Sequence, residues 1–363
     1  MKQITPTYSL AYPRYLNRRK FLRVLGRVLI RLLTRTKVEG LENIPDSGPV
    51  ILAGNHAAYL EPILMAVLPK RIVEPIGAGD LPFEGGVSSI VSFYGFIAVN
   101  RGNLDRKAME QAMDVLRQGG VIGIFPEGGT WAPGRMAPQI GVALLSQRTG
   151  AVVVPIGFSG LQSSLKRALQ LKRPKLVMKV GKPIPAMPAD GSGIDKNRLI
   201  AYSQQVLDAI YDQVTDEEKS LFPLESRYSL WIERAGEDNE ELLGGSALAN
   251  FLHSPVLLDS FKINLKVPVN PLYEHKKSVK ASSIHHSLQA ILTYLKLNPA
   301  FFTYRMGVEE GSQVEVGIRS LIELLERAER EGKPFSLHTQ EILTYSDGRQ
   351  EINKKLFQIE PGV

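Results

Sequence analysis

Short apolar runs alternate with amphipathic helical patterns between residues 39 and 215, and this alternation limits the possible folds more than any other feature. The first strand pattern is PVILAGN, and the helical pattern YLEPILMAVL follows it. The same succession continues with GFIAVNR, RKAMEQAMDVLRQGG, VIGIFPEGG, IGVALLSQRTG, AVVVPIGFSG, LVMKVGKPIP and NRLIAYSQQVLDAIYDQV. Strands that alternate with helices pair most readily in parallel, so this segment predicts an α/β domain with a mostly parallel central sheet flanked by helices.

The 363-residue chain divides by composition into three parts. Residues 1–38 form a basic arm, residues 39–215 the α/β domain, and a polar stretch, TDEEKS, precedes a third part at residues 222–363. The third part contains two helical patterns, HHSLQAILTYLKL and GIRSLIELLERAEREG, and a hairpin pattern centred on Asp347-Gly348. It predicts a smaller C-terminal α+β region, to which the sequence assigns no chemistry.

The positive charge of the chain is concentrated in the arm. The net charge is +7, but residues 1–38 hold ten Lys or Arg and no Asp or Glu, so the remainder sums to −3. Five arginines recur every fourth residue, and apolar residues cover the opposite side of the same helical pattern. The arginines are Arg19, Arg23, Arg27, Arg31 and Arg35. This pattern predicts a helix that lies on an anionic membrane surface.

Two alternatives to that membrane-surface helix are a surface helix with a solvated basic face and a nucleic-acid contact. No aromatic or glycine-rich base-reading pattern accompanies the charge, so we expect no nucleic-acid partner. No run of about 18 uncharged apolar residues is present, which disfavours a spanning helix. Arginines interrupt the only candidate signal-peptide segment. The expected location is therefore peripheral, on the cytoplasmic face of the membrane.

The chain contains no cysteine, which excludes disulfides, thiolate zinc sites and thiol nucleophiles and fits a reducing compartment. His285 and His286 are adjacent in a helical pattern and would point in different directions, so no metal site is expected there.

One histidine lies in the first half of the chain, in GNHAAYLEPIL. Five positions along a single helix correspond to about 140°, so His56 and Glu61 can meet only if His56 precedes the helix and Glu61 lies in its first turn. Glu61 could then accept a hydrogen bond from Nδ1, leaving Nε2 as a base toward a substrate hydroxyl. The alternative is a purely structural histidine at a strand end.

Four blocks follow one another in order: NHAAYLEP, GFIAVNRGN, IFPEGGT and VVPIGF. Together they resemble the glycerolipid acyltransferase family, which includes the lysophosphatidic acid and glycerol-3-phosphate acyltransferases. The resemblance covers roughly residues 20–215. The matching residues are Asn55, His56, Gly95, Phe96, Ile97, Arg101, Phe125, Pro126, Glu127, Gly128, Val154, Pro155 and Ile156.

The resemblance implies transfer of a fatty acyl group to the hydroxyl of a lysophosphatidate-like lysolipid acceptor in phospholipid synthesis. The donor would be acyl-CoA or acyl carrier protein as co-substrate, with no cofactor. His56, assisted by Glu61, would be the general base, and Arg101 would bind the acceptor phosphate through its bidentate guanidinium. A strand-end surface arginine is the alternative for Arg101. The acceptor site would be shaped by Phe125, Pro126, Glu127, Gly128 and Gly129, the glycines allowing a close backbone approach.

Three departures from the family pattern concern the acceptor site. The family usually has aspartate where this chain has Glu61, and FPEGT is here FPEGG with Thr130 one place later. No lysine lies in residues 137–143, and Arg135 is the nearest cation. The alternatives are therefore an acyltransferase acting on a glycolipid or ornithine-type lipid, and a catalytically weak lipid-binding module.

Overall fold

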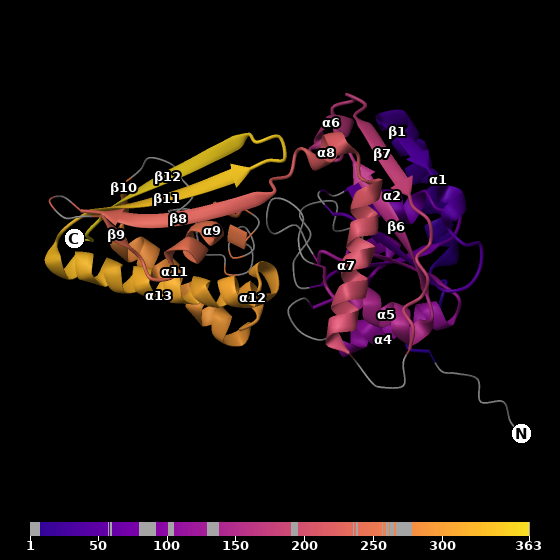
Figure 1. The fold of residues 1–363 in the computed structure, drawn as a ribbon, viewed down its shortest axis with the longest axis horizontal. Coiled ribbons are helices and arrows are strands. Elements are labelled where there is room, and N and C mark those ends of the chain that lie inside the picture. The colour runs from indigo at the N-terminus through magenta and orange to yellow at the C-terminus, as the bar shows by residue number, and fades with distance from the viewer. Residues whose placement is uncertain are drawn as a thin grey trace, which may run out of the picture. The chain divides into compact units, whose positions relative to one another are not determined.

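The computed structural model describes residues 8–56, 58, 60–79, 92–100, 105–128, 138–189, 195–234, 236, 239–255, 257–258, 261, 265 and 278–362. The chain forms two compact units (Figure 1). The first comprises residues 1–130 and 135–219, and the second comprises residues 131–134 and 220–363. The predicted arm and the predicted α/β domain thus form one unit, and the boundary expected after residue 38 falls inside a strand, β1 (Arg35–Glu39).

A central sheet organises the first unit, with the strand order β1-β7-β6-β2-β5-β3-β4 in the described part of the chain. The strands are β2 (Val50–Gly54), β3 (Val73–Ala78), β4 (Ile97–Val99), β5 (Val121–Ile124), β6 (Val152–Ser159), β7 (Lys175–Val180) and β1. Strands β2 to β6 run parallel to one another, whereas β7 is antiparallel to β6, and β1 is parallel to β7. The mostly parallel sheet is confirmed. The apolar pattern does not predict β3, because Glu74 and Pro75 interrupt its run.

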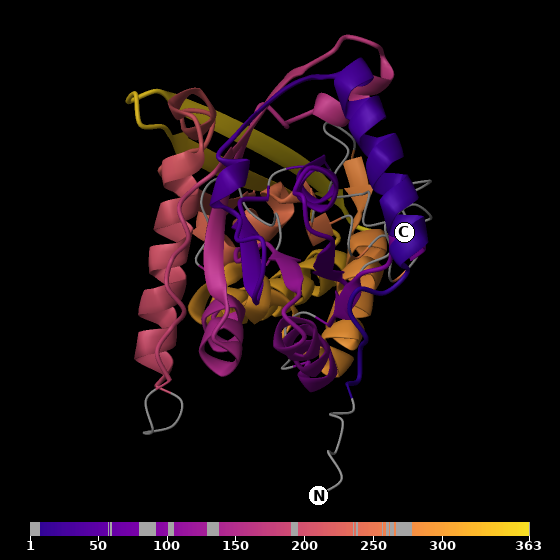
Figure 2. The same ribbon diagram turned by 90° about the vertical axis from the view of Figure 1, so that its right-hand side faces the viewer.

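Helices cover both faces of this sheet (Figures 1 and 2). They are α1 (Leu16–Leu33), η1 (Leu41–Asn43), α2 (Leu60–Val67), α4 (Arg106–Arg117), α5 (Gly141–Thr149), α6 (Ser164–Leu169), α7 (Lys196–Gln213) and α8 (Asp216–Lys219). Side chains of β2 alternate between two apolar clusters. Ile51 and Ala53 pack with α4, α5 and α7, while Val50 and Leu52 pack with α2. β2 is therefore buried on both faces, as its continuous apolar run predicts.

α1 is helical as predicted, and two arginines of its basic stripe face the rest of the first unit. Arg19 and Arg23 are buried, and an apolar stripe is exposed instead. The exposed residues are Leu16, Phe21, Val24, Leu25, Val28, Leu29 and Leu32. Arg19 and Arg23 are therefore not available to an anionic surface, and the membrane-surface role of the helix stays a prediction.

The inward arginines of α1 have partners in the α/β domain. The Arg19 guanidinium pairs with the buried Glu74 carboxylate of β3 at 2.6 and 2.8 Å and also donates to the carbonyls of Tyr94 and Gly95. Arg23 and Arg27 both donate to the carbonyl of Pro69, which lies just after the C-terminus of α2. Charge-assisted hydrogen bonds to a carboxylate and to carbonyls offset the cost of burying arginine.

The second unit is an antiparallel-rich sheet with helices on one face (Figure 1). Its strands are β8 (Glu225–Glu233), β9 (Glu240–Glu241), β10 (Ser278–Lys280), β11 (Phe335–Thr344) and β12 (Gln350–Glu360). Its helices include α9 (Gly245–His253), α11 (Ala281–Leu297), α12 (Phe301–Met306) and α13 (Val308–Glu331). β11 and β12 form the predicted hairpin, and Gly348 takes the positive φ of 81° that its turn requires. The C-terminal α+β region is confirmed.

Candidate active site

Four predicted site residues lie together at the carboxyl ends of β2 and β5, which are adjacent parallel strands. His56 follows β2, Phe125 and Glu127 follow β5, and Glu61 lies in the first turn of α2. In α/β proteins, ligands usually bind at the edge of the sheet where the parallel strands have their carboxyl ends.

His56 and Glu61 have the arrangement that the spacing predicted, with the histidine before the helix and the carboxylate in its first turn. His56 Nδ1 lies 3.8 Å from Glu61 Oε2, slightly longer than a hydrogen bond. The histidine side chain is 27% exposed, whereas that of Glu61 is 1% exposed. Glu61 Oε1 accepts the backbone N–H of Ala58 at 2.7 Å, which fixes the carboxylate. Nδ1 is buried, so Nε2 is the ring nitrogen through which His56 can reach an acceptor hydroxyl.

Phe125 and Glu127 hold His56 from the β5 side. The rings of His56 and Phe125 stack with centroids 4.4 Å apart and an interplanar angle of 29°. Glu127 is buried; its Oε2 accepts the backbone N–H of His56 at 3.1 Å, and its Oε1 accepts the Tyr211 hydroxyl of α7 at 2.6 Å. Glu127 thus links the loop after β2, the loop after β5 and helix α7.

Residues Pro126 to Gly128 form a tight turn around Glu127. Gly128 has a φ of 74°, in the left-handed region, and its N–H donates to the carbonyl of Phe125 at 3.0 Å. Pro126 is buried, and its carbonyl accepts the N–H of Gln139 at 2.7 Å. The glycine is needed for the backbone conformation of the turn.

Asn55 anchors the strand end that carries His56. Its amide exchanges two hydrogen bonds with the backbone of Phe158 in β6, at 3.0 and 2.7 Å. Because β6 neighbours β2, these bonds tie the start of the His56 loop to the sheet on the side opposite β5.

Several predicted residues lie outside the described residues. They are Arg101, Gly129, Thr130 and Arg135. Their assignments, above all that of Arg101 to the acceptor phosphate, stay predictions.

Two further residues near the site carry no sequence signal of their own. Tyr211 contacts Glu127 from 84 positions along the chain, and Glu218 of α8 is buried, with its charge close enough to interact with that of Glu61. Burial raises the pKa of the Glu218 carboxyl; a hydrogen bond from Gly160 lowers it, and the nearby charge of Glu61 raises it. Neither residue belongs to a motif: Tyr211 lies in the predicted helix NRLIAYSQQVLDAIYDQV, and Glu218 lies in the polar stretch TDEEKS, for which no helix was predicted.

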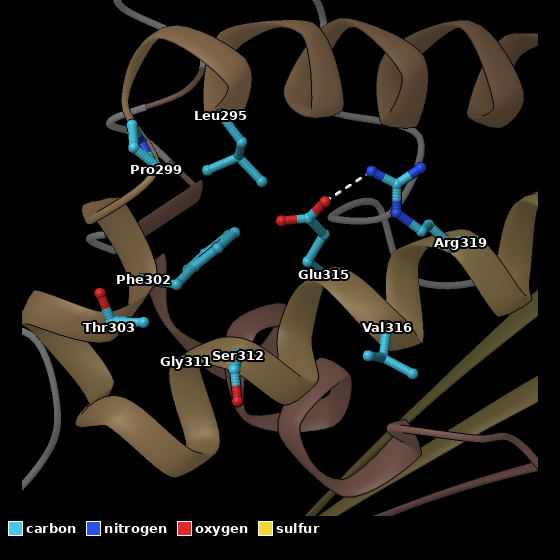
Figure 3. A pocket seen from close by; sticks show the side chains of 9 residues that line it. All are labelled: Leu295, Pro299, Phe302, Thr303, Gly311, Ser312, Glu315, Val316 and Arg319. Atoms are coloured by element: carbon cyan, nitrogen blue, oxygen red, sulfur yellow. Dashed lines mark hydrogen bonds and ion pairs between the residues drawn. The ribbon is translucent and has the colours of Figure 1, made fainter.

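A small pocket of about 240 Å³ lies among α11, α12 and α13 in the second unit (Figure 3). Leu295, Phe302 and the Glu315 carboxylate, which pairs with Arg319 at 2.5 Å, border it. None of the predicted site residues lines it. Among the described residues there is no group of three or more His, Asp or Glu side chains that could hold a metal ion.

The fold and the paired His56 and Glu61 define an α/β domain with a histidine–carboxylate pair at its strand ends. Residues 35–159 match the family model described as Acyltransferase. Within the described residues, no helix is long and apolar enough to cross a bilayer.

Several curated relatives of this chain carry the name 1-acyl-sn-glycerol-3-phosphate acyltransferase. The protein of that name from Borreliella burgdorferi is 32% identical over 125 residues, covering 33% of this chain and 49% of its own length. The chloroplastic BAT2 from Brassica napus is 26% identical over 162 residues, covering 42% and 46%. The Bacillus subtilis protein is 24% identical over 167 residues, covering 46% and 81%. The chain spans about half the length of the first relatives it matches.

The chain is also similar to a solved structure, that of the 1-acyl-sn-glycerophosphate acyltransferase PlsC from Thermotoga maritima. It is 22% identical, with a TM-score of 0.39, and the match covers 56% of this chain and 83% of that one.

Proposed function

We propose that the protein is a membrane-associated acyltransferase that moves a fatty acyl group from acyl-CoA or acyl carrier protein to the hydroxyl of a lysophosphatidate-like acceptor. The observation that carries this proposal is the pair formed by His56 and Glu61, with the imidazole partly exposed and the carboxylate buried. The family match supports acyl transfer, and the names of the relatives support the acceptor class.

The chemistry requires one proton transfer in each direction. His56 Nε2 takes the proton of the acceptor hydroxyl while the hydroxyl oxygen attacks the thioester carbonyl. The thiolate then leaves and receives the proton from the imidazolium, which the Glu61 carboxylate stabilises. The acyl group passes directly between substrates, so neither a covalent acyl-enzyme nor a cofactor is needed. Arg101 is the proposed ligand of the acceptor phosphate.

A lysolipid acceptor lies in the bilayer interface, and α1 is suited to bring the enzyme there. Its exposed stripe of leucine, valine and phenylalanine forms an apolar surface, which bilayer burial would stabilise by up to about 1.5–3 kcal/mol for each large side chain. The proposed location is the cytoplasmic face, with anionic lipids as the surface.

The test measures acyl transfer by the purified protein in anionic vesicles. The vesicles contain one of three acceptors: a lysophosphatidate, a lysoglycolipid or a lyso-ornithine lipid. Acyl-CoA and acyl carrier protein thioesters are supplied in turn, and products are read by mass spectrometry. We expect a diacyl product from lysophosphatidate and a loss of about 10²–10⁴-fold in rate for His56→Ala. His286→Ala, which removes a histidine of α11 in the second unit, is the matched control and should retain full activity.

The three acceptors also separate the alternatives. If only the glycolipid or the ornithine-type lipid were acylated, that lipid would be the acceptor in place of lysophosphatidate. The departure of FPEGG from the family pattern is the reason for testing these two acceptors. Vesicle binding without any product from either donor would overturn the enzymatic proposal in favour of a lipid-binding module.

A further inference from the structure

A second acid-free stretch begins at residue 128, far along the sequence from the N-terminal arm at residues 1–38. Residues 128–189 contain nine Lys or Arg and no Asp or Glu. Five of these cations lie on α6 and the chain that joins it to β7, here called the basic turn (residues 164–175). They are Lys166, Arg167, Lys172, Arg173 and Lys175, and all five are exposed.

Two leucines of the basic turn are among the most exposed apolar residues of the first unit. Leu169 is 72% exposed and Leu171 is 73% exposed. Leu171 also has a φ of 59°, in the left-handed region that glycine or asparagine adopts with less strain than leucine. Packing within the first unit does not account for leucine at a position that is both strained and solvent-exposed, which points to a function outside the fold.

The basic turn lies against the C-terminal end of α1 (Figure 2). The Arg173 guanidinium donates to the carbonyls of Arg31 and Thr34 at 3.2 and 3.5 Å, and the N–H of Arg35 donates to the carbonyl of Pro174 at 2.9 Å. Arg35 and Lys175 are also partners in the β1–β7 register. Leu32, in the last turn of α1, belongs to the exposed apolar stripe, so the stripe and the basic turn meet at this end of the helix.

We propose that the basic turn is a second membrane-contact element, which inserts Leu169 and Leu171 into the bilayer interface and places its cations on anionic headgroups beside α1. No acidic residue lies near these cations in the sequence, so an anionic partner would bind them favourably. The exposed leucines between them would be buried favourably in an apolar layer next to that charge. A bilayer of anionic lipid offers both. An acidic carrier protein would satisfy the cations, but continuity with the apolar stripe of α1 favours lipid. The proposal rests on the membrane association of the proposed function, not on acyl transfer.

The first arm of the test removes the leucines. We would measure sedimentation of the full chain with phosphatidylglycerol–phosphatidylcholine vesicles and compare the partition coefficients of Leu169→Gln/Leu171→Asn and wild type. We expect about tenfold weaker partition or more. Thermal unfolding should be unchanged or shifted upward, because asparagine relieves the strain at residue 171. Leu243→Gln/Leu297→Asn, which alters two exposed leucines of the second unit, is the control.

The second arm removes charge. Each cation near an anionic surface strengthens binding about fivefold, so Lys166→Gln/Lys172→Gln should partition about 25-fold less on the phosphatidylglycerol vesicles. On vesicles of phosphatidylcholine alone this double variant should behave as the wild type does. Lys196→Gln/Arg198→Gln, on the exposed first turn of α7, makes the same charge change and should have little effect.

Wild-type partition by both sets of variants would overturn the inference while leaving membrane association through α1 intact. Failure of the wild-type protein itself to partition would overturn the membrane association as well, whereas acyl transfer to detergent-dispersed acceptors is scored separately. The variants could also bind vesicles normally and be slower only in acyl transfer from acyl carrier protein. That result would assign the basic turn to docking of the donor and overturn the lipid assignment.

Discussion

At the scale of single residues, the candidate site depends on carboxylates that bind backbone as well as side chains. Glu61 uses one oxygen for the N–H of Ala58 and turns the other toward His56. Glu127 does the same between the N–H of His56 and the hydroxyl of Tyr211. The histidine is therefore positioned through its backbone by Glu127 and through its ring by Phe125, with Glu61 at Nδ1.

Tyr211→Phe tests the positioning role of Glu127. Loss of the hydroxyl removes the 2.6 Å donor to Glu127 Oε1, so the carboxylate and the His56 loop it holds should lose their fixed geometry. We expect kcat to fall about 10-fold to 100-fold with little change in donor KM, and the free energy of unfolding to fall by about 1–2 kcal/mol. Steady-state kinetics and urea unfolding measure these quantities.

Tyr202→Phe is the matched control for Tyr211→Phe. Tyr202 lies on the same helix, and its hydroxyl donates to the carbonyl of Pro185 at 2.8 Å, away from the site. Its loss should lower stability and leave kcat unchanged. Equal losses of kcat in the two variants would show that Tyr211 acts through general stability only.

Glu218 gives a prediction about pH. Because burial raises its pKa in the folded chain above the ordinary value of 4.5, its contribution to stability is fully present below pH 4.5 and is lost as the pH rises through the raised value. Glu218→Gln removes the ionisation, and its amide oxygen can still accept the N–H of Gly160. The variant should therefore gain stability relative to wild type as the pH rises from below 4.5 to neutral.

Urea unfolding midpoints at the two pH values measure the gain expected for Glu218→Gln. Glu217→Gln removes an exposed carboxylate of the same short helix and is the control. A Glu218→Gln difference that stays constant with pH would contradict the assignment.

At the scale of elements, α1 shows what periodicity can and cannot predict. A stripe of arginines opposite a stripe of apolar residues predicts a helix, but either stripe can face inward if the interior offers suitable partners. Here Glu74 and the carbonyls beyond α2 accept the arginines, and a Cβ at Gly26 would lie 3.0 Å from the Val67 side chain. These partners belong to segments 40–75 residues away, so the arm alone carried no information about them.

Arg19→Met tests the inward orientation of α1. The variant leaves the buried Glu74 carboxylate paired with Arg14 at 2.5 Å and leaves two backbone carbonyls without the Arg19 donor. We expect a loss of about 3 kcal/mol in the free energy of unfolding. Arg31→Met, an exposed member of the same stripe, should change it by less than about 0.5 kcal/mol. Urea unfolding of both variants measures the two changes, and equal small effects would contradict the buried pair.

The elements that the sequence predicted best are those whose patterns are local. β2, β5 and β6 are continuous apolar runs, and the motif blocks at their ends were enough to group His56, Glu61 and Glu127 into one site. β3 carries a buried glutamate whose partner comes from α1, and Tyr211 reaches Glu127 through tertiary packing alone. Such residues follow from the fold and not from a local pattern.

At the scale of the whole molecule, the chain contains two units that each have their own sheet and helices. We expect a chain truncated after Lys219 to unfold cooperatively in urea, because the sheet of the first unit and the apolar clusters packed on it lie within residues 1–219. Its m-value should be about three fifths of the value for the whole chain, in proportion to the surface exposed. Circular dichroism during urea titration measures both properties.

A chain truncated after Gln213 is the control for the truncation after Lys219. It lacks α8 and the hydrogen bond between Thr215 N–H and Ser159 Oγ, so it should be less stable. A non-cooperative transition in the longer truncation would show that the first unit depends on the second.

The inward arginines of α1 also determine how the protein would respond to ionic strength. Arg19 and Arg23 are buried and hydrogen-bonded to Glu74 and to backbone carbonyls, so their guanidinium groups cannot contact lipid headgroups. Attachment through α1 would therefore persist in concentrated salt, where the Debye length shrinks to about 3 Å, while the exposed cations around Lys172 would be screened. A high-salt wash would therefore remove the charge contribution of the basic turn and leave the apolar contacts of α1, Leu169 and Leu171, and release of the protein would require detergent.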